Sequence, residues 1–170
     1  MYWEALGAMF MVLTGSALHF AFSWSNDWQP IALIAAVNES IWEHLKLAFW
    51  PGLIWALFPN KFSTASVSQR TAMRGFSLFV TVVSIVIVFE TYTSMTGRNL
   101  LVLDIGTFVF AIVLGQLLVV FLLGNTRPSP RMKLMGLLML SAQVVAFSLF
   151  TYFPPDHWLF VDQRTGLSGL

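Results

Sequence analysis

The stretch "VNESIWEHLKLAFWPGLIW" (residues 37–55) places charged and polar side chains inside an otherwise apolar segment. Apolar residues continue on both sides, so a surface loop is excluded. An ionisable side chain near the centre of a bilayer costs roughly 3 kcal/mol on insertion scales and usually marks a functional position. The segment therefore predicts a membrane helix that carries a site, with four candidates for catalytic roles: Glu39, Glu43, His44 and Lys46.

The composition indicates a membrane protein. Hydrophobic residues make up 57% of the 170 residues and charged residues only 10%, against about 25% charged in soluble proteins. The apolar segments approach the roughly 20 residues that a helix needs to cross a bilayer. We therefore expect a single all-α transmembrane domain over residues 1–170. A net charge of +1 gives no reason to expect nucleic acid, and the absence of cysteine excludes disulfides and thiolate metal sites.

The apolar runs predict five transmembrane helices. The second run contains Ser40 and Glu43 at the spacing of a capping box, so a break that starts a new helix at Ser40 is an alternative to one continuous helix. The first run is expected to be retained as a helix, because it lacks the basic start of a signal peptide. The predicted spans are about 5–24, 30–58, 75–96, 100–123 and 134–153.

Basic residues in the connections predict the orientation. The second and fourth connections carry most of them, and basic connections stay in the cytoplasm. This places the N-terminus inside and the C-terminus outside. The residues concerned are Lys61, Arg70, Arg74, Arg127, Arg131 and Lys133.

In this orientation the ionisable residues gather toward the outer side. Glu90 and Asp104 flank the turn at Gly97 by about two helical turns each. We therefore expect them at equal depth on adjacent antiparallel helices. Together with the second segment they predict one outward-opening cavity, lined by Glu39, Glu43, His44, Glu90 and Asp104, with His19 and His157 at its mouth.

On a continuous helix Glu39, Glu43 and Lys46 would share one face. They could neutralise one another there as a purely structural network, which is the alternative to a functional site. Gln116 and Gln143 are expected to form hydrogen bonds between helices.

Carboxylates and imidazoles suit a divalent metal ion, whose identity the residues leave open. The candidate metal ligands are Glu43, His44, Glu90, Asp104, His19 and His157. A metal-dependent hydrolase, or a binding site for a lipid-like or amphiphilic ligand, is the first hypothesis. A proton- or cation-coupled transporter and a non-catalytic accessory subunit are the alternatives. Whether the chain is an enzyme stays open. We expect the lipid bilayer as its surroundings, and whether it forms a homo-oligomer there stays open as well.

Four stretches carry a resemblance: "GSALHFAFSWS" (15–25), "VNESIWEHLKLAFWP" (37–51), "TGRNLLVLDI" (96–105) and "FTYFPPDHWLFVDQRTG" (150–166). With them the chain resembles an uncharacterised family of small bacterial multi-helix membrane proteins, a domain of unknown function with a NESxWEHLK motif. The resemblance implies a multi-pass protein of the bacterial cytoplasmic membrane. It implies no activity, substrate or catalytic residue.

Overall fold

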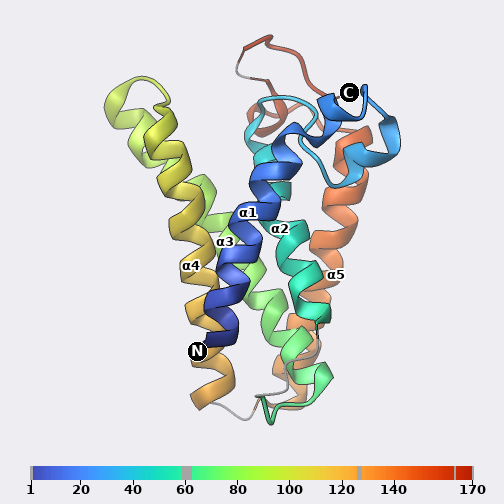
Figure 1. Cartoon of the computed structure of the whole chain (residues 1–170), viewed down its shortest axis with the longest axis vertical. Helices are drawn as coiled ribbons and strands as arrows, with labels where there is room; N and C mark the ends of the chain where they lie inside the picture. Colours follow the sequence, from blue (N-terminus) through green and yellow to red (C-terminus); the bar gives the residue numbers. More distant parts are fainter. Residues whose placement is uncertain (1, 59–62, 126–127, 163, 170) are drawn as a thin grey trace.

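A computed structural model describes residues 2–58, 63–125, 128–162 and 164–169. Within these residues the chain forms five α-helices and two short 3-10 helices, which confirms the all-α prediction. The helices run side by side, with the two chain termini at opposite ends of the bundle (Figure 1). Their bounds are α1 Tyr2–Trp24, η1 Gln29–Leu33, α2 Ile41–Leu57, α3 Val67–Thr96, α4 Leu101–Asn125, α5 Pro130–Tyr152 and η2 Trp158–Phe160.

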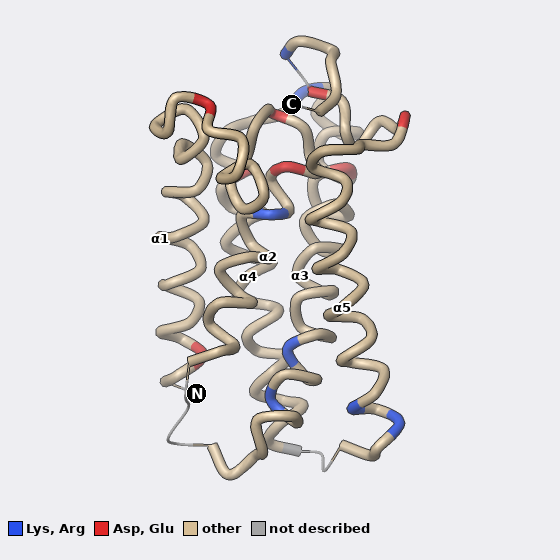
Figure 2. The backbone as a smooth tube through the Cα atoms, turned by 90° about the vertical axis from the view of Figure 1, so that its right-hand side faces the viewer, with Lys and Arg blue, Asp and Glu red and all other residues tan. Residues whose placement is uncertain are grey.

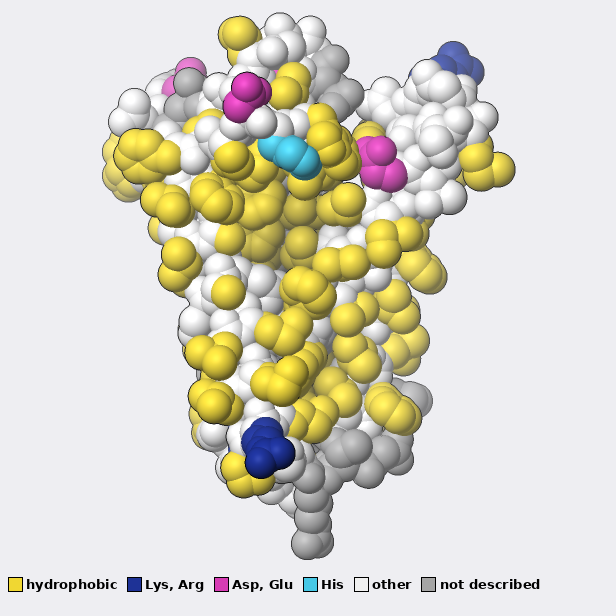
Figure 3. All heavy atoms as spheres, turned by 180° about the vertical axis from the view of Figure 1, so that it is seen from behind, with side chains coloured by type: hydrophobic (Ala, Val, Ile, Leu, Met, Phe, Trp, Pro, Cys, Tyr) yellow, Lys and Arg dark blue, Asp and Glu magenta, His cyan; other side chains and the backbone are white. Residues whose placement is uncertain are grey.

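Among the described residues, four helices are long and apolar enough to cross a membrane: α1, α3, α4 and α5. Hydrophobic side chains cover the middle of the face in Figure 3, and its charged side chains lie toward the two ends. This distribution is what a bilayer requires of a protein that spans it. By helix length and composition the chain is a multi-pass membrane protein.

The second predicted span, 30–58, is wrong as a continuous helix. The chain forms the short helix η1, leaves helical conformation, and begins α2 at Ile41. The Ser40 hydroxyl accepts a hydrogen bond from the Glu43 N–H at 3.4 Å, so the predicted break at Ser40 is confirmed. The 17 residues of α2 rise about 25 Å, less than the hydrocarbon thickness of about 30 Å.

α1, α3 and α5 begin earlier than their apolar runs, α3 and α5 by the most. α3 starts at Val67, where Ser66 and Gln69 form a capping box. α5 starts at Pro130 behind the N-cap Ser129. Apolar runs mark only the part of a helix that suits lipid, whereas a capped polar turn can extend the helix beyond it.

Close packing fixes the arrangement of the helices. α3 packs against α2, α4 and α5, and α1 packs against α2 and α4. Where α3 meets α5, a Cβ atom on Gly136 would lie 2.2 Å from the Ala72 carbonyl oxygen, so only glycine allows this approach. α2 is enclosed by its neighbours, with nine of its 17 residues buried.

Most lysines and arginines lie toward the end of the bundle that holds the N-terminus, whereas most acidic residues lie at the opposite end (Figure 2). Two of the predicted basic residues, Lys61 and Arg127, lie outside the described residues. Arg70, Arg74, Arg131 and Lys133 belong to the starts of α3 and α5, which lie at the same end.

The two glutamines link helices, as predicted. At the N-terminal end Arg74 forms a buried ion pair with Glu4, at 2.7 Å between Nη2 and Oε2, and also donates to the Gln116 side chain. Gln143 donates to the Gly75 carbonyl oxygen at 3.2 Å. These hydrogen bonds connect α1, α3, α4 and α5, although the buried Gln143 Oε1 has no hydrogen-bond partner among the described residues.

Candidate metal centre

A cavity of about 490 Å³ lies between α1, α2, α3, α4 and the C-terminal segment, which is the part of the chain after η2 (described residues 161–162 and 164–169). Most of its wall is apolar, from residues such as Val12, Ile85 and Phe108. Its ionisable lining residues are His19, Glu39, His44, Asp104 and Arg164. The cavity therefore combines an apolar wall with a compact group of charged and imidazole side chains.

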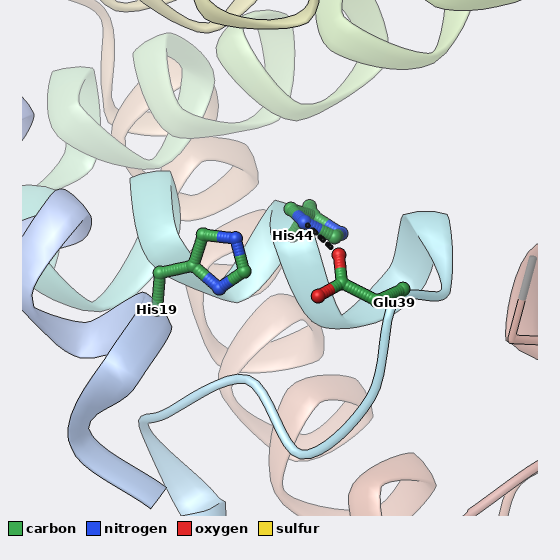
Figure 4. A group of neighbouring side chains, drawn as sticks. All are labelled: His19, Glu39 and His44. Carbon is green, nitrogen blue, oxygen red and sulfur yellow. Dashed lines mark ion pairs between the residues drawn. The ribbon is translucent and has the colours of Figure 1, made fainter. Parts of the chain in front are cut away.

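Three of these residues form a group that could hold a metal ion. One ligand atom each from His19, Glu39 and His44 lies within 4.8 Å of the other two. Figure 4 shows the three side chains facing a common space, His19 from α1, Glu39 from the loop before α2, and His44 from the first turn of α2. The imidazole rings of His19 and His44 lie 5.1 Å apart, edge to face.

The break in the second segment orients His44. Its Nδ1 lies 2.8 Å from the Ser40 carbonyl oxygen, which can only accept a hydrogen bond. Nδ1 therefore carries the proton in this contact, and the lone pair of a neutral ring is on Nε2. That atom faces Glu39, at 3.4 Å from Oε2. Histidines that bind metals are commonly oriented by such a bond from the other ring nitrogen.

The C-terminal segment holds Glu39 in place. The Glu39 N–H donates to Asp162 Oδ2 at 3.2 Å, and its Oε1 lies 3.5 Å from Arg164 Nη2. Nearby, Asn38 Nδ2 donates to the Gly169 carbonyl oxygen at 2.9 Å. The two carboxylate oxygens of Glu39 thus have different neighbours, one facing His44 and the other facing Arg164.

Asp162 is the anchor of this segment. Burial alone would raise the pKa of Asp162, but backbone N–H groups of Arg164, Glu39 and Thr165 donate to the carboxylate and lower its pKa overall. The charged form accepts all three bonds, so it is the form that the fold stabilises.

Glu43 and Lys46 do not line the cavity. Lys46 Nζ lies 2.6 Å from Glu43 Oε2 and donates to the Ala32 carbonyl oxygen and to Thr151 Oγ1, at 2.7 and 3.0 Å. Glu43 also accepts from the Val37 N–H at 3.0 Å. Glu43 and Lys46 thus neutralise each other, as the structural alternative predicted for these two residues, and they also pair with backbone groups of the segment before α2. Glu39 is absent from this pair, because it precedes α2 and does not share its helical face.

Of the two acids flanking the Gly97 turn, only Asp104 faces the cavity. It accepts a hydrogen bond from the Tyr92 hydroxyl and is half-buried. Glu90 is exposed and lies outside the cavity, since its neighbour Phe89 occupies the inward position on α3. Equal depth does not fix rotation about the helix axis, and successive residues differ by about 100°.

His157 also lies outside the cavity. It is exposed, and its Nδ1 accepts a bond from the Leu159 N–H at 3.4 Å, capping η2. Of the six predicted ligands, the structure therefore brings His19 and His44 into the three-residue group, with Asp104 in the same cavity. Glu43, Glu90 and His157 are elsewhere.

Sequence reasoning missed two contributors, Asp162 and Arg164. Both belong to the run "DQRTG" (162–166), which has the composition of a turn closed by an aspartate side chain. That signal predicts a turn, but it does not reveal that the turn packs on Glu39, some 120 residues earlier in the chain.

Comparisons with known proteins show the family alone. Neither a search of curated proteins nor a search of solved structures found a match. The model of the DUF6512 family, described as a family of unknown function, matches residues 1–170. The chain, with its cavity and its group of two histidines and a glutamate, therefore belongs to the DUF6512 family.

Proposed function

We propose that the chain binds a divalent metal ion, zinc by ligand type, through His19, Glu39 and His44, and that the ion serves hydrolysis in the cavity. The observation that carries this proposal is the mutual approach of three ligand atoms within 4.8 Å. Two imidazoles and one carboxylate, with a fourth position open, form a donor set typical of catalytic zinc.

The contacts within the group support a metal more than a simple ion pair. With metal–ligand distances near 2.1 Å, tetrahedral ligands lie about 3.4 Å apart. His44 Nε2 and Glu39 Oε2 are 3.4 Å apart, which is long for a charged hydrogen bond but suits two ligands of one ion. The bond between His44 Nδ1 and the Ser40 carbonyl oxygen supplies the supporting contact that such ligands need.

A bound ion of this kind supplies an activated water at near-neutral pH. Asp104 lines the same cavity and is the carboxylate suited to accept a proton from that water. Tyr92 donates to Asp104 and orients it. Glu39 and His44 thus act as ligands in this proposal, Asp104 as the base, and Glu43 with Lys46 as support for the break.

The orientation rule supports an outer location for the centre. Basic residues at the starts of α3 and α5 lie at the opposite end of the bundle from the metal group. If that basic end is cytoplasmic, the cavity faces the outer side of the membrane, which we take to be a bacterial cytoplasmic membrane. A transport path is less well supported, because the apolar core residues Met11, Phe49 and Leu78 lie between the two ends.

Metal analysis of purified protein tests the proposal. We expect about one zinc per wild-type chain, and loss of most of it in His19→Ala, Glu39→Gln and His44→Ala. His157→Ala is the matched control, because His157 is an exposed histidine outside the cavity and should leave the zinc content unchanged. Circular dichroism would confirm that each variant is folded.

Wild-type protein that carries no metal and is not stabilised by added zinc, manganese or magnesium would overturn the proposal. Equal zinc loss in His157→Ala would mean that the ion is not bound by His19, Glu39 and His44 alone. Hydrolysis would then be measured with metal-loaded protein, where Asp104→Asn should retain zinc but lose turnover.

A further inference from the structure

We propose that the cavity binds an anionic amphiphile with a single apolar chain, taken from the membrane. Its phosphate or carboxylate head would lie at Arg164 and the metal ion, and its chain along the apolar wall. This inference rests on the proposed metal centre and names the class of ligand that the centre serves.

The shape of the cavity fits such a ligand. Its volume of about 490 Å³ lies within the 300–1,000 Å³ typical of small-molecule sites. The charged and imidazole residues come from the outer parts of α1 and α4, the loop before α2, the first turn of α2 and the C-terminal segment. The apolar wall is provided by residues that include Val12, Leu47, Ile85, Phe89, Phe108 and Val109.

The charges at the polar part favour an anion once the metal is bound. Without the ion, the two carboxylates of Glu39 and Asp104 outnumber the single guanidinium of Arg164, so these three side chains carry one net formal negative charge. A divalent cation reverses this to one net positive charge. An anionic head would then be attracted to the cavity, and the same head would be repelled by the metal-free protein.

Arg164 is placed to contact the head. Its backbone N–H donates to Asp162 Oδ1 at 2.6 Å, which fixes the chain at this point. Its side chain is 76% exposed and lies 3.5 Å from Glu39 Oε1, so several guanidinium donors have no partner in this contact. An arginine fork matches the oxygens of phosphate and carboxylate groups.

The exposed residues on the α4 side of the cavity support entry of the ligand from the lipid. Leu101 and Ile105 line the cavity on α4 and are nevertheless 73% and 56% exposed. Both are apolar, and they lie on a helix that is long and apolar enough to cross the membrane. The cavity therefore opens beside an apolar surface, from which a membrane amphiphile could enter with its chain already in lipid.

Binding of dodecyl phosphate to zinc-loaded protein in phosphatidylcholine nanodiscs tests the inference. Radiolabelled ligand retained above empty nanodiscs should saturate at about one per chain. Inorganic phosphate and uncharged dodecyl maltoside should each compete at least tenfold more weakly, because each lacks one half of the ligand. Removal of the zinc should abolish the binding.

Single variants test separately how the charged end and the apolar wall of the cavity contribute to ligand binding. Arg164→Ala should weaken binding about tenfold, as expected for loss of a charged hydrogen bond, without changing the zinc content. Val109→Trp should block the apolar wall and reduce binding by a similar factor. Val113→Trp is its matched control, one turn further along α4, 42% exposed and outside the cavity.

The outcomes distinguish this inference from the metal centre. Full zinc content without retained dodecyl phosphate would overturn the ligand class and leave the centre intact, whereas absence of zinc would overturn both. Equal competition by inorganic phosphate would exclude a role for the chain. Unchanged affinity in Arg164→Ala would exclude the proposed position of the head.

Discussion

Replacing Lys46 by methionine should destabilise the protein strongly, although it removes a charge from the interior of a membrane protein. The Lys46 side chain is fully buried, and its ammonium group contacts the Glu43 carboxylate, the Ala32 carbonyl oxygen and the Thr151 hydroxyl. Methionine fills a similar volume but donates no hydrogen bond. The substitution therefore leaves a buried carboxylate and a backbone carbonyl without their principal donor.

The expected magnitude follows from the number of groups left unpaired. Removing one partner of a buried ion pair costs about 3–5 kcal/mol. For a chain of this size each kcal/mol lowers the unfolding midpoint by about 2–4 °C, which gives a decrease of roughly 6–20 °C. The double variant Glu43→Leu/Lys46→Met should be less destabilised than the single one, because no buried carboxylate remains.

Thermal unfolding in detergent, followed by circular dichroism, measures the effect. Lys133→Met is the control, since Lys133 lies in the first turn of α5, away from the break. A Lys46→Met midpoint within 2 °C of the wild type, by the same scale, would show that the pair does not support the fold. A double variant less stable than the single one would refute the argument from the stranded carboxylate.

Two further predictions concern the C-terminal segment and the orientation. Because the folded-state pKa of Asp162 is lowered, its contribution to stability is complete above the unfolded-state value of about 3.9 and is lost as the pH falls through the folded-state value. The amide NMR signal of Thr165 should therefore titrate only below about pH 4, and a transition above pH 5 would contradict the lowered pKa. In the cysteine-free chain, Asp27→Cys should react with an impermeant maleimide on intact cells and Ser66→Cys should not, and the reverse pattern would mean an inverted topology.

Much of the architecture could be predicted from composition. Apolar runs indicated the helices, because lipid requires long apolar segments with internally paired backbones. The same reasoning joined residues 30–58 into one helix, since hydropathy does not register a break whose backbone groups are paired by buried side chains. The capping pattern at Ser40 was the signal that located the break.

The sequence predicted which types of residue form the candidate site, but it predicted less well which individual residues line the cavity. His19, Glu39, His44 and Asp104 were identified because ionisable residues are expensive in a membrane helix. Glu90 was misplaced because its depth follows from the turn at Gly97, whereas its direction depends on how α3 is rotated against its neighbours. Arg164 could not be assigned to the cavity, since its position depends on contacts of the C-terminal segment that sequence spacing does not describe.

The break in the second segment also affects how the protein enters its membrane. α2 has 17 residues and carries Glu43 and Lys46, and a charged residue costs roughly 2.5–3.5 kcal/mol at the centre of a helix that inserts by itself. Inserted alone, α2 would keep the contact between Glu43 and Lys46 but would lose the partners of this pair outside α2, which are the Val37 N–H, the Ala32 carbonyl oxygen and the Thr151 hydroxyl. In a translocon assay the isolated segment should insert poorly, and more completely when α1 precedes it and α3 to α5 follow. We therefore expect the second segment to become stable in the bilayer only after the other helices have packed against it, because its own hydrophobicity is not sufficient.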